Sequence, residues 1–237
     1  MSSSQLRTPA PTILGRLEEQ NRTEPPALAR AHTAVLLVEN HQALRKGLEL
    51  LLRASGIDLA GVAGTADEGF RMCTDRRPDV TVVDGALGLS AVEQILRIDP
   101  DAGVVLYTAS ADREEIEAAA SYGARGFVLK DGGSDELITA IATVAGGGVY
   151  VDPAVSALLR GSVPSDVLTT REREILQMLA GGLTGERSAE LLFLSPETVR
   201  THIRNAMRKL RASTRVHAVA LALSLGEISQ PPPAASS

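Results

Sequence analysis

The sequence predicts an α/β domain with a five-stranded, parallel, doubly wound sheet, followed by an all-α domain of four helices. Three observations predict this order. Short apolar runs alternate with helical stretches over residues 33–147, residues 148–166 are rich in Gly, Pro and Ser, and helical periodicity without strands fills residues 167–226. The chain has 237 residues, 44% of them hydrophobic, which is enough for two domains with cores of their own.

The first domain is expected to contain five buried strands, because its apolar runs are short and are bounded by turn residues. The runs are AVLLV (34–38), LAGVAG (59–64), DVTVVD (79–84), GVVLYT (103–108) and GFVLK (126–130). The expected helices lie between them, near residues 42–54, 66–75, 90–98, 112–122 and 134–145. In parallel sheets, functional residues gather where the strands end. The residues at those ends are Glu39, Asn40, Asp84, Thr108 and Lys130.

The rest of the chain divides into flexible segments and helices. Residues 1–32, rich in Ser, Pro, Thr and Glu, are expected to form a flexible leader, and residues 148–166 a linker with room for one short helix. The four helices of the second domain are expected near residues 170–180, 184–192, 196–211 and 214–225. Residues 227–237, which end in QPPPAASS, are expected to form a disordered tail.

Composition excludes several classes of protein. The chain lacks an apolar run long enough to span a membrane and lacks a secretory signal, so we expect a cytoplasmic protein without a membrane partner. A single cysteine, Cys73, excludes an intrachain disulfide and a clustered cysteine metal site. Residues 31–150 carry ten Lys and Arg against eighteen Asp and Glu, whereas residues 164–237 carry nine against seven. This asymmetry indicates two domains with different tasks.

The segment SPETVRTHIRNAMRKLR (195–211) is expected to form a helix that Ser195 caps and Pro196 begins. At roughly 100° per residue, the helix separates an apolar face from a cationic face. The apolar face contains Val199, Ile203, Ala206, Met207 and Leu210, and the cationic face contains Arg200, Arg204, Arg208 and Arg211. The cationic face favours an anionic partner, although basic amphipathic helices also bind membranes and other proteins.

Residues 168–223 resemble the four-helix DNA-binding domain of LuxR/NarL-type transcription regulators. The residues that carry the resemblance are Glu174, Gly182, Ala189, Leu194, Ser195, Thr198, Val199, His202, Lys209 and Leu210. The resemblance implies that helix 196–211 enters the major groove of DNA. The DNA-binding residues that it implies are Arg200, Thr201 and Arg204 in the groove, Arg208 and Lys209 near phosphates, and Ser195 and Thr198. One departure is Ser188, which stands where the family buries an apolar residue.

Residues 33–147 resemble a response-regulator receiver, which implies a flavodoxin-like fold. Matched residue by residue, Asp84 is the phosphoacceptor, Thr108 and Lys130 contact the phosphoryl group, and Phe127 takes the aromatic switch position. The implied Mg²⁺ ligands are Glu39, Asn40, Asp84 and the backbone carbonyl of Ala86.

Two departures from the receiver pattern predict a degenerate phosphoacceptor site. Asn40 stands where the family has a second acidic residue, and the loop GALGLS (85–90) lacks the usual proline step. Because Mg²⁺ prefers carboxylate oxygens, we expect weakened Mg²⁺ binding and weak or absent control by phosphorylation.

The two resemblances together imply a bacterial transcription regulator of the response-regulator type, and not an enzyme. The implied partners are double-stranded DNA, a second copy of the chain at least on DNA, and a sensor histidine kinase. In the family, the two domains pack together until a signal frees the recognition helix. Three alternatives stay open: a conventional response regulator phosphorylated at Asp84, a phosphotransfer protein, and a protein-binding module without DNA binding.

Overall fold

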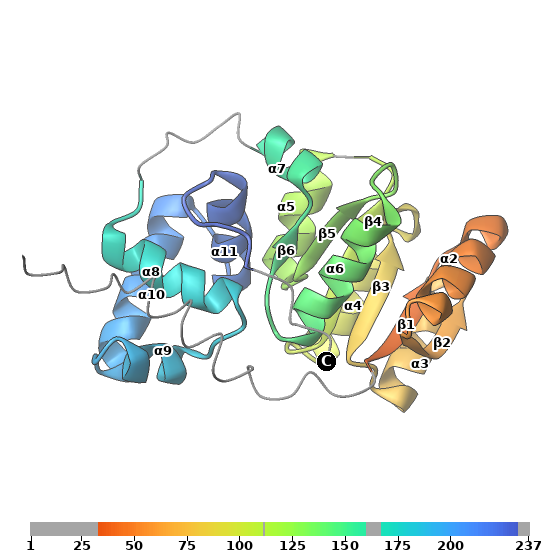
Figure 1. The fold of residues 1–237 in the computed structure, drawn as a ribbon, viewed down its shortest axis with the longest axis horizontal. Helices are drawn as coiled ribbons and strands as arrows, with labels where there is room; N and C mark the ends of the chain where they lie inside the picture. Colours follow the sequence, from red (N-terminus) through yellow and green to blue (C-terminus); the bar gives the residue numbers. More distant parts are fainter. Residues whose placement is uncertain (1–32, 111, 160–166, 232–237) are drawn as a thin grey trace, which may run out of the picture.

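One sheet of six parallel strands organises the first domain (Figure 1). The protein is described by a computed structural model that covers residues 33–110, 112–159 and 167–231, so the leader predicted at 1–32 lies outside the described residues. The strands are β1 (Ala34–Val38), β2 (Asp58–Ala63), β3 (Val80–Asp84), β4 (Gly103–Thr108), β5 (Gly126–Leu129) and β6 (Tyr150–Val151). Their order, β2-β1-β3-β4-β5-β6, confirms the doubly wound α/β fold.

Helices cover both faces of the sheet. They are α2 (Gln42–Ala54), α3 (Ala66–Arg76), α4 (Leu89–Ile98), α5 (Arg113–Tyr122) and α6 (Ser134–Ala145). Side chains of α2 and α6 pack with Val35 and Val82 on one face, whereas α4 and α5 pack with Val83 and Leu106 on the other. The central strands β3 and β4 are buried at every residue, which explains why their sequences, VTVVD and GVVLYT, are mostly apolar.

The segment predicted as a linker contains two further elements, β6 and the short helix α7 (Pro153–Leu159). Tyr150 pairs with Gly126 and Val151 with Phe127, so β6 extends the sheet beyond the five expected strands. The side chain of Asp152 accepts a hydrogen bond from the Ala154 amide at the start of α7. A strand of two residues is too short to produce a recognisable pattern, and this is why the prediction missed it.

The second domain consists of α8 (Thr170–Ala180), α9 (Gly185–Leu191), α10 (Pro196–Leu210) and α11 (Arg215–Ser224). A threonine or serine caps the start of each helix, and the first cap is a reciprocal capping box between Thr169 and Glu172. Ile175 of α8, Ala189 of α9 and Val199 of α10 form a core shared by three of the helices. The four helices therefore lie where the sequence predicts them.

The prediction of a disordered tail from residue 227 is wrong for residues 227–231. Glu227 is buried, with its carboxylate 2.7 Å from Arg173, and it accepts a hydrogen bond from the Val167 amide. The Gln230 side chain donates to the Val149 carbonyl at 2.8 Å and accepts from the Val151 amide at 3.2 Å. Gln230 thus bonds to the sheet edge as a neighbouring strand would, and holds the segment in place. Residues 232–237 lie outside the described part of the chain.

The two domains meet at α11, which Figure 1 shows on the side of the helical domain that faces β6 and α5. Every residue of α11 from His217 to Ser224 is buried. One apolar cluster contains residues of both domains, among them Ile116 of α5 and Leu221 of α11. The Thr214 hydroxyl also lies 3.4 Å from the Ala120 carbonyl oxygen of α5. The interface is therefore largely apolar, with α11 as its centre.

A second contact between the domains is made by backbone alone. The Val149 amide donates to the Ala180 carbonyl at 3.0 Å, and Gly182 lies directly against the loop of Gly146 and Gly147. Gly182 has φ +86°, and a Cβ atom there would overlap the Gly146 carbonyl oxygen. The close approach of the two loops therefore requires glycine at position 182.

We expect Gly182→Ala to loosen this contact by about 1–2 kcal/mol, because it adds left-handed strain as well as a steric overlap. Hydrogen exchange at the Val149 amide should accelerate accordingly. Gly181→Ala is the matched control, since its φ is −80° and its Cβ would lie 3.5 Å from the nearest atom. Equal exchange in both variants and the wild type would contradict this account of the contact.

Candidate functional sites

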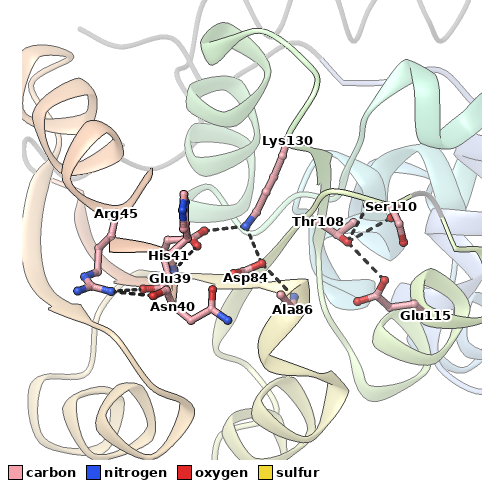
Figure 2. A network of polar contacts seen from close by, with 10 residues as sticks. All are labelled: Glu39, Asn40, His41, Arg45, Asp84, Ala86, Thr108, Ser110, Glu115 and Lys130. Atoms are coloured by element: carbon pink, nitrogen blue, oxygen red, sulfur yellow. Dashed lines mark hydrogen bonds and ion pairs between the residues drawn. The ribbon is translucent and has the colours of Figure 1, made fainter. Parts of the chain in front are cut away.

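Three charged side chains meet at the carboxyl end of the sheet. The Lys130 ammonium lies 2.8 Å from Glu39 Oε2 and 2.7 Å from Asp84 Oδ1, and Figure 2 shows it between the two carboxylates. Glu39 follows β1, Asp84 ends β3 and Lys130 follows β5, so the parallel topology brings them to one edge. Both carboxylate side chains are 1% exposed, and Lys130 is 14% exposed. The predicted grouping of these residues is present.

Burial and ion pairing act in opposite directions on these groups. Burial disfavours the charged form of Asp84, but hydrogen bonds from Lys130 and the Ala86 amide outweigh it, so the pKa of Asp84 lies below its ordinary value. Burial also disfavours the charged form of Lys130, but Asp84 and Glu39 raise its pKa above the ordinary value. Asp84 Oδ2 is buried and accepts no hydrogen bond from the described residues. Asp84 is therefore ionised, with one oxygen that is held and one that is not.

Thr108 is buried beside this cluster and has a partner that the sequence did not reveal. Its hydroxyl lies 3.2 Å from the Ser110 carbonyl and 3.4 Å from Glu115 Oε2 (Figure 2). Burial and the nearby carboxylates of Asp112 and Asp84 raise the pKa of Glu115. Gly85 fits against both Thr108 and Glu115, and a Cβ there would lie 2.7 Å from each. Glu115 therefore holds the Thr108 hydroxyl next to the Asp84 loop.

The oxygen donors near Asp84 fit a divalent cation only in part. Glu39 and Asp84 supply two carboxylates, and Asp84 Oδ2 is free to accept a further partner. Asn40 is exposed and contributes an uncharged amide, whereas Ala86 uses its amide to donate to Asp84. In the described ranges, no group of three or more His, Cys, Asp or Glu side chains could hold a metal ion. Lys130 also neutralises the two carboxylates that a cation would use.

Phe127, at the predicted switch position, is buried at the interface between the domains. It lines a small apolar pocket with Ile116, Val151, His217 and Leu221. These residues come from β5, α5, β6 and α11, so the Phe127 side chain lines the same pocket as α11 of the second domain. A change in the position of Phe127 therefore acts directly on the packing of α11.

The cationic face of α10 is open to solvent. Val199, Ala206 and Leu210 are buried against the other helices. The exposed residues on the opposite face are Arg200, Thr201, Arg204 and Arg208. Ser195 caps the helix by accepting from the Thr198 amide at 3.1 Å, so both residues position its first turn. Arg200 pairs with Glu197 at 3.0 Å, an exposed i,i+3 pair that a stronger anion can displace.

The structure gives Lys209 a partner other than DNA. Its ammonium lies 2.7 Å from Oε2 of Glu172, which is 4% exposed and also accepts from the Thr169 amide in the capping box. Burial opposes ionisation of Glu172, but Lys209 and Thr169 outweigh it and lower the pKa of that carboxyl. Lys209 therefore forms an ion pair that holds α10 on α8, and its contact with a DNA phosphate stays a prediction.

Ser188 is buried, as its position in the family pattern implies. Its hydroxyl donates to the Thr184 carbonyl at 2.9 Å, so the polar group that replaces an apolar side chain has a partner. The departure from the family pattern at Ser188 is therefore accommodated inside α9.

Comparisons with known proteins match each of the two domains to a family. The model for the response regulator receiver domain matches residues 35–142, and the model for bacterial regulatory proteins of the luxR family matches residues 166–222. The transcriptional regulatory protein MctR of Rhizobium johnstonii is 35% identical over 209 residues, which cover 85% of this chain and 98% of that protein. The transcriptional activator DevR/DosR of Mycobacterium tuberculosis is 33% identical over 211 residues, which cover 84% and 97%.

Comparison with solved structures supports the fold. The RcsB response regulator of Salmonella typhimurium aligns with a TM-score of 0.52 and 21% sequence identity, over 82% of this chain and 99% of that one. None of the helices in the described ranges has the length and apolar content that a membrane crossing requires.

We expect Lys130→Met to destabilise the first domain by about 3 kcal/mol, because it leaves two buried carboxylates without their cation. The low pKa of Asp84 means that its ion pair stabilises the fold above about pH 4 and that this contribution is lost as the pH falls through the folded-state pKa. The difference from wild type, measured by urea unfolding, should therefore shrink in acid. Lys46→Met, which removes an exposed pair with Glu49, should change the stability by less than about 0.5 kcal/mol. Similar values for the two variants would count against the buried cluster.

The ion pair between Lys209 and Glu172 leads to a second stability prediction. Lys209→Met should destabilise the helical domain by about 2 kcal/mol, because Glu172 stays buried without its cation. Arg208→Met, one position earlier on the exposed face, should leave the melting temperature nearly unchanged. Melting curves recorded by circular dichroism compare the two variants. A larger loss of stability in Arg208→Met would contradict the structural role of the Lys209–Glu172 pair.

Proposed function

This chain belongs to the response regulators that carry a LuxR-type DNA-binding domain, and we propose that it controls transcription by inserting α10 into duplex DNA. The observation that carries the proposal is the exposed row of Arg200, Arg204 and Arg208 on a helix whose other face is buried. Phosphates of the DNA backbone attract such a row, and arginine can also hydrogen-bond two acceptors of guanine in the major groove.

Each residue of this face has a proposed task. Arg200 and Thr201 lie in the first half of α10 and Arg204 lies near its centre, so all three are placed to meet base edges. Arg208 lies one turn later and suits the phosphate backbone. Ser195 and Thr198 hold the first turn of this helix in place.

The resemblance implies that the receiver covers the recognition helix, α10. In this chain the receiver packs against α11 instead. The cationic face of α10 is exposed, whereas α11 is buried against α5 and β6. We assign α11 as the surface through which two copies pair on DNA, since its apolar residues would suit a symmetric contact. The packed arrangement then prevents pairing without covering the recognition helix.

Asp84 is the proposed phosphoacceptor. Its unpaired Oδ2 suits attack on a phosphoryl group supplied by a sensor kinase, while Lys130 stabilises the negative charge that develops. Glu39, Asp84, Asn40 and the Ala86 carbonyl would hold Mg²⁺, which would neutralise further charge when bound. Because only two of these ligands are carboxylates, we propose weak Mg²⁺ binding and slow phosphorylation.

Salt and base dependence test the DNA-binding proposal. Affinity for a duplex selected from a random pool should fall steeply with added salt, with about 0.9 in the logarithmic slope for each phosphate that an arginine neutralises. Arg204→Ala should weaken binding to the selected duplex by about 1–3 kcal/mol and relax its base preference. Arg53→Ala, which removes an exposed cation from α2, is the control and should change neither quantity. Salt-independent binding would refute the proposal.

The missing carboxylate is tested by restoring it. Asn40→Asp should raise both Mg²⁺ affinity and the rate of labelling by acetyl phosphate, because it adds a negative ligand beside Asp84. The double variant with Asp84→Ala should lose the label altogether. Rapid Mg²⁺-dependent labelling of the wild type would show that position 40 does not limit phosphorylation.

A further inference from the structure

A cleft of about 370 Å³ lies between the two domains, away from both sites described above. The first domain contributes Arg125, Gly147 and Val149 to its wall. The second contributes Leu183, Arg215 and Val219, among others. A volume of this size accommodates a small organic molecule, and clefts between domains are common ligand sites. The glycine contact beside the cleft fixes the distance between its two walls.

Two arginines, one from each domain, give the cleft its charge. The side chain of Arg125 is 16% exposed, and its nearest carboxylate is that of Asp101, at 3.5 Å. Asp101 is 82% exposed, so this pair is long and largely screened by solvent. Burial lowers the pKa of Arg125, and the positive charge of Arg215 lowers it further. The carboxylates of Asp101 and Asp99 raise this pKa but do not outweigh the lowering. The two guanidinium groups therefore repel each other across the cleft.

The other carboxylate on the cleft wall does not balance this charge. Glu186 is 67% exposed, and its carboxylate lies 3.9 Å from Arg200 of the DNA-binding face, outside the arginine pair. Arg215 has no ion-pair partner within the described part of the chain. The space between Arg125 and Arg215 is therefore suited to an anionic group. Leu183, Val216 and Val219 beside it offer an apolar surface.

We propose that this cleft binds a small anion with an apolar body, either a phosphate monoester or a carboxylic acid of an aromatic or aliphatic group. The anionic group bridges Arg125 and Arg215, and the apolar body covers Leu183, Val216 and Val219. Charge-assisted hydrogen bonds to two guanidinium groups and the removal of their repulsion provide the affinity. Because the ligand contacts both domains, it stabilises their packed arrangement. Under the proposed function, such a ligand keeps α11 from pairing and opposes DNA binding without phosphorylation.

Calorimetry with phenyl phosphate on the full-length chain tests the site. Phenyl phosphate has the required anion and apolar body, inorganic phosphate has only the anion, and benzyl alcohol has only the apolar ring. We expect phenyl phosphate to bind more tightly than either. Arg125→Gln and Arg215→Gln should each weaken its binding by about tenfold, the loss of one charge-assisted hydrogen bond.

Two matched controls, Arg53→Gln in the first domain and Arg187→Gln in the second, remove exposed cations away from the cleft. These controls should leave the affinity for phenyl phosphate unchanged. Undiminished binding in both cleft variants, or phenyl phosphate binding no tighter than inorganic phosphate, would overturn the proposal. Arg215 is exposed, so its variant keeps the test valid if circular dichroism shows that Arg125→Gln does not fold. No DNA is present in these titrations, so their failure would leave the proposed DNA binding intact.

Discussion

Burial of α11 by two domains at once is the constraint on which the rest of the structure depends. The helix completes the core of the DNA-binding domain with Leu176 and Leu210, and the same cluster continues into Ile116 and Phe127 of the receiver. While the apolar residues of α11 pack against the receiver, they cannot pack against a second copy of the chain. The glycine contact, the hydrogen bonds of Gln230 and the walls of the cleft lie at the same interface between the domains.

The proposed phosphoacceptor site at Asp84 is connected to this interface through two elements. β5 carries Phe127 into the pocket beside α11 and leads to Lys130, and α5 carries Glu115 at its start and Ile116 in the interface. A phosphoryl group on Asp84 would compete with Glu115 for the Thr108 hydroxyl and with both carboxylates for Lys130. Either change would act on an element that packs against α11. The geometry thus provides a physical route between the Asp84 site and α11, the proposed dimer surface. The cleft is a second proposed point at which the same equilibrium is biased.

Parallel topology explains why the sequence predicted most of the fold and of the phosphoacceptor site. Strands that alternate with helices must end at one edge, so Glu39, Asp84 and Lys130 could be placed together before any distance was known. The sequence could not show that Glu115 turns back onto Thr108, or that Lys209 reaches Glu172 in another helix, because these contacts depend on tertiary packing. The approach of Gly182 to Gly146 and the ordering of residues 227–231 are likewise properties of the interface between domains. A two-residue strand such as β6 gives no periodic signal at all.

We infer that the receiver holds α11 and that the protein binds DNA as a dimer only when α11 is released from the receiver. Double electron–electron resonance measures this directly, with spin labels at Lys46→Cys in α2 and Arg187→Cys in α9 and with Cys73 replaced by alanine. Both label positions are exposed, on elements of different domains. For the free protein we expect one narrow distribution of the distance between the two labels. When a selected duplex with two half-sites is added, we expect a second, displaced distribution. A single unchanged distribution in the fully DNA-bound protein would contradict this inference.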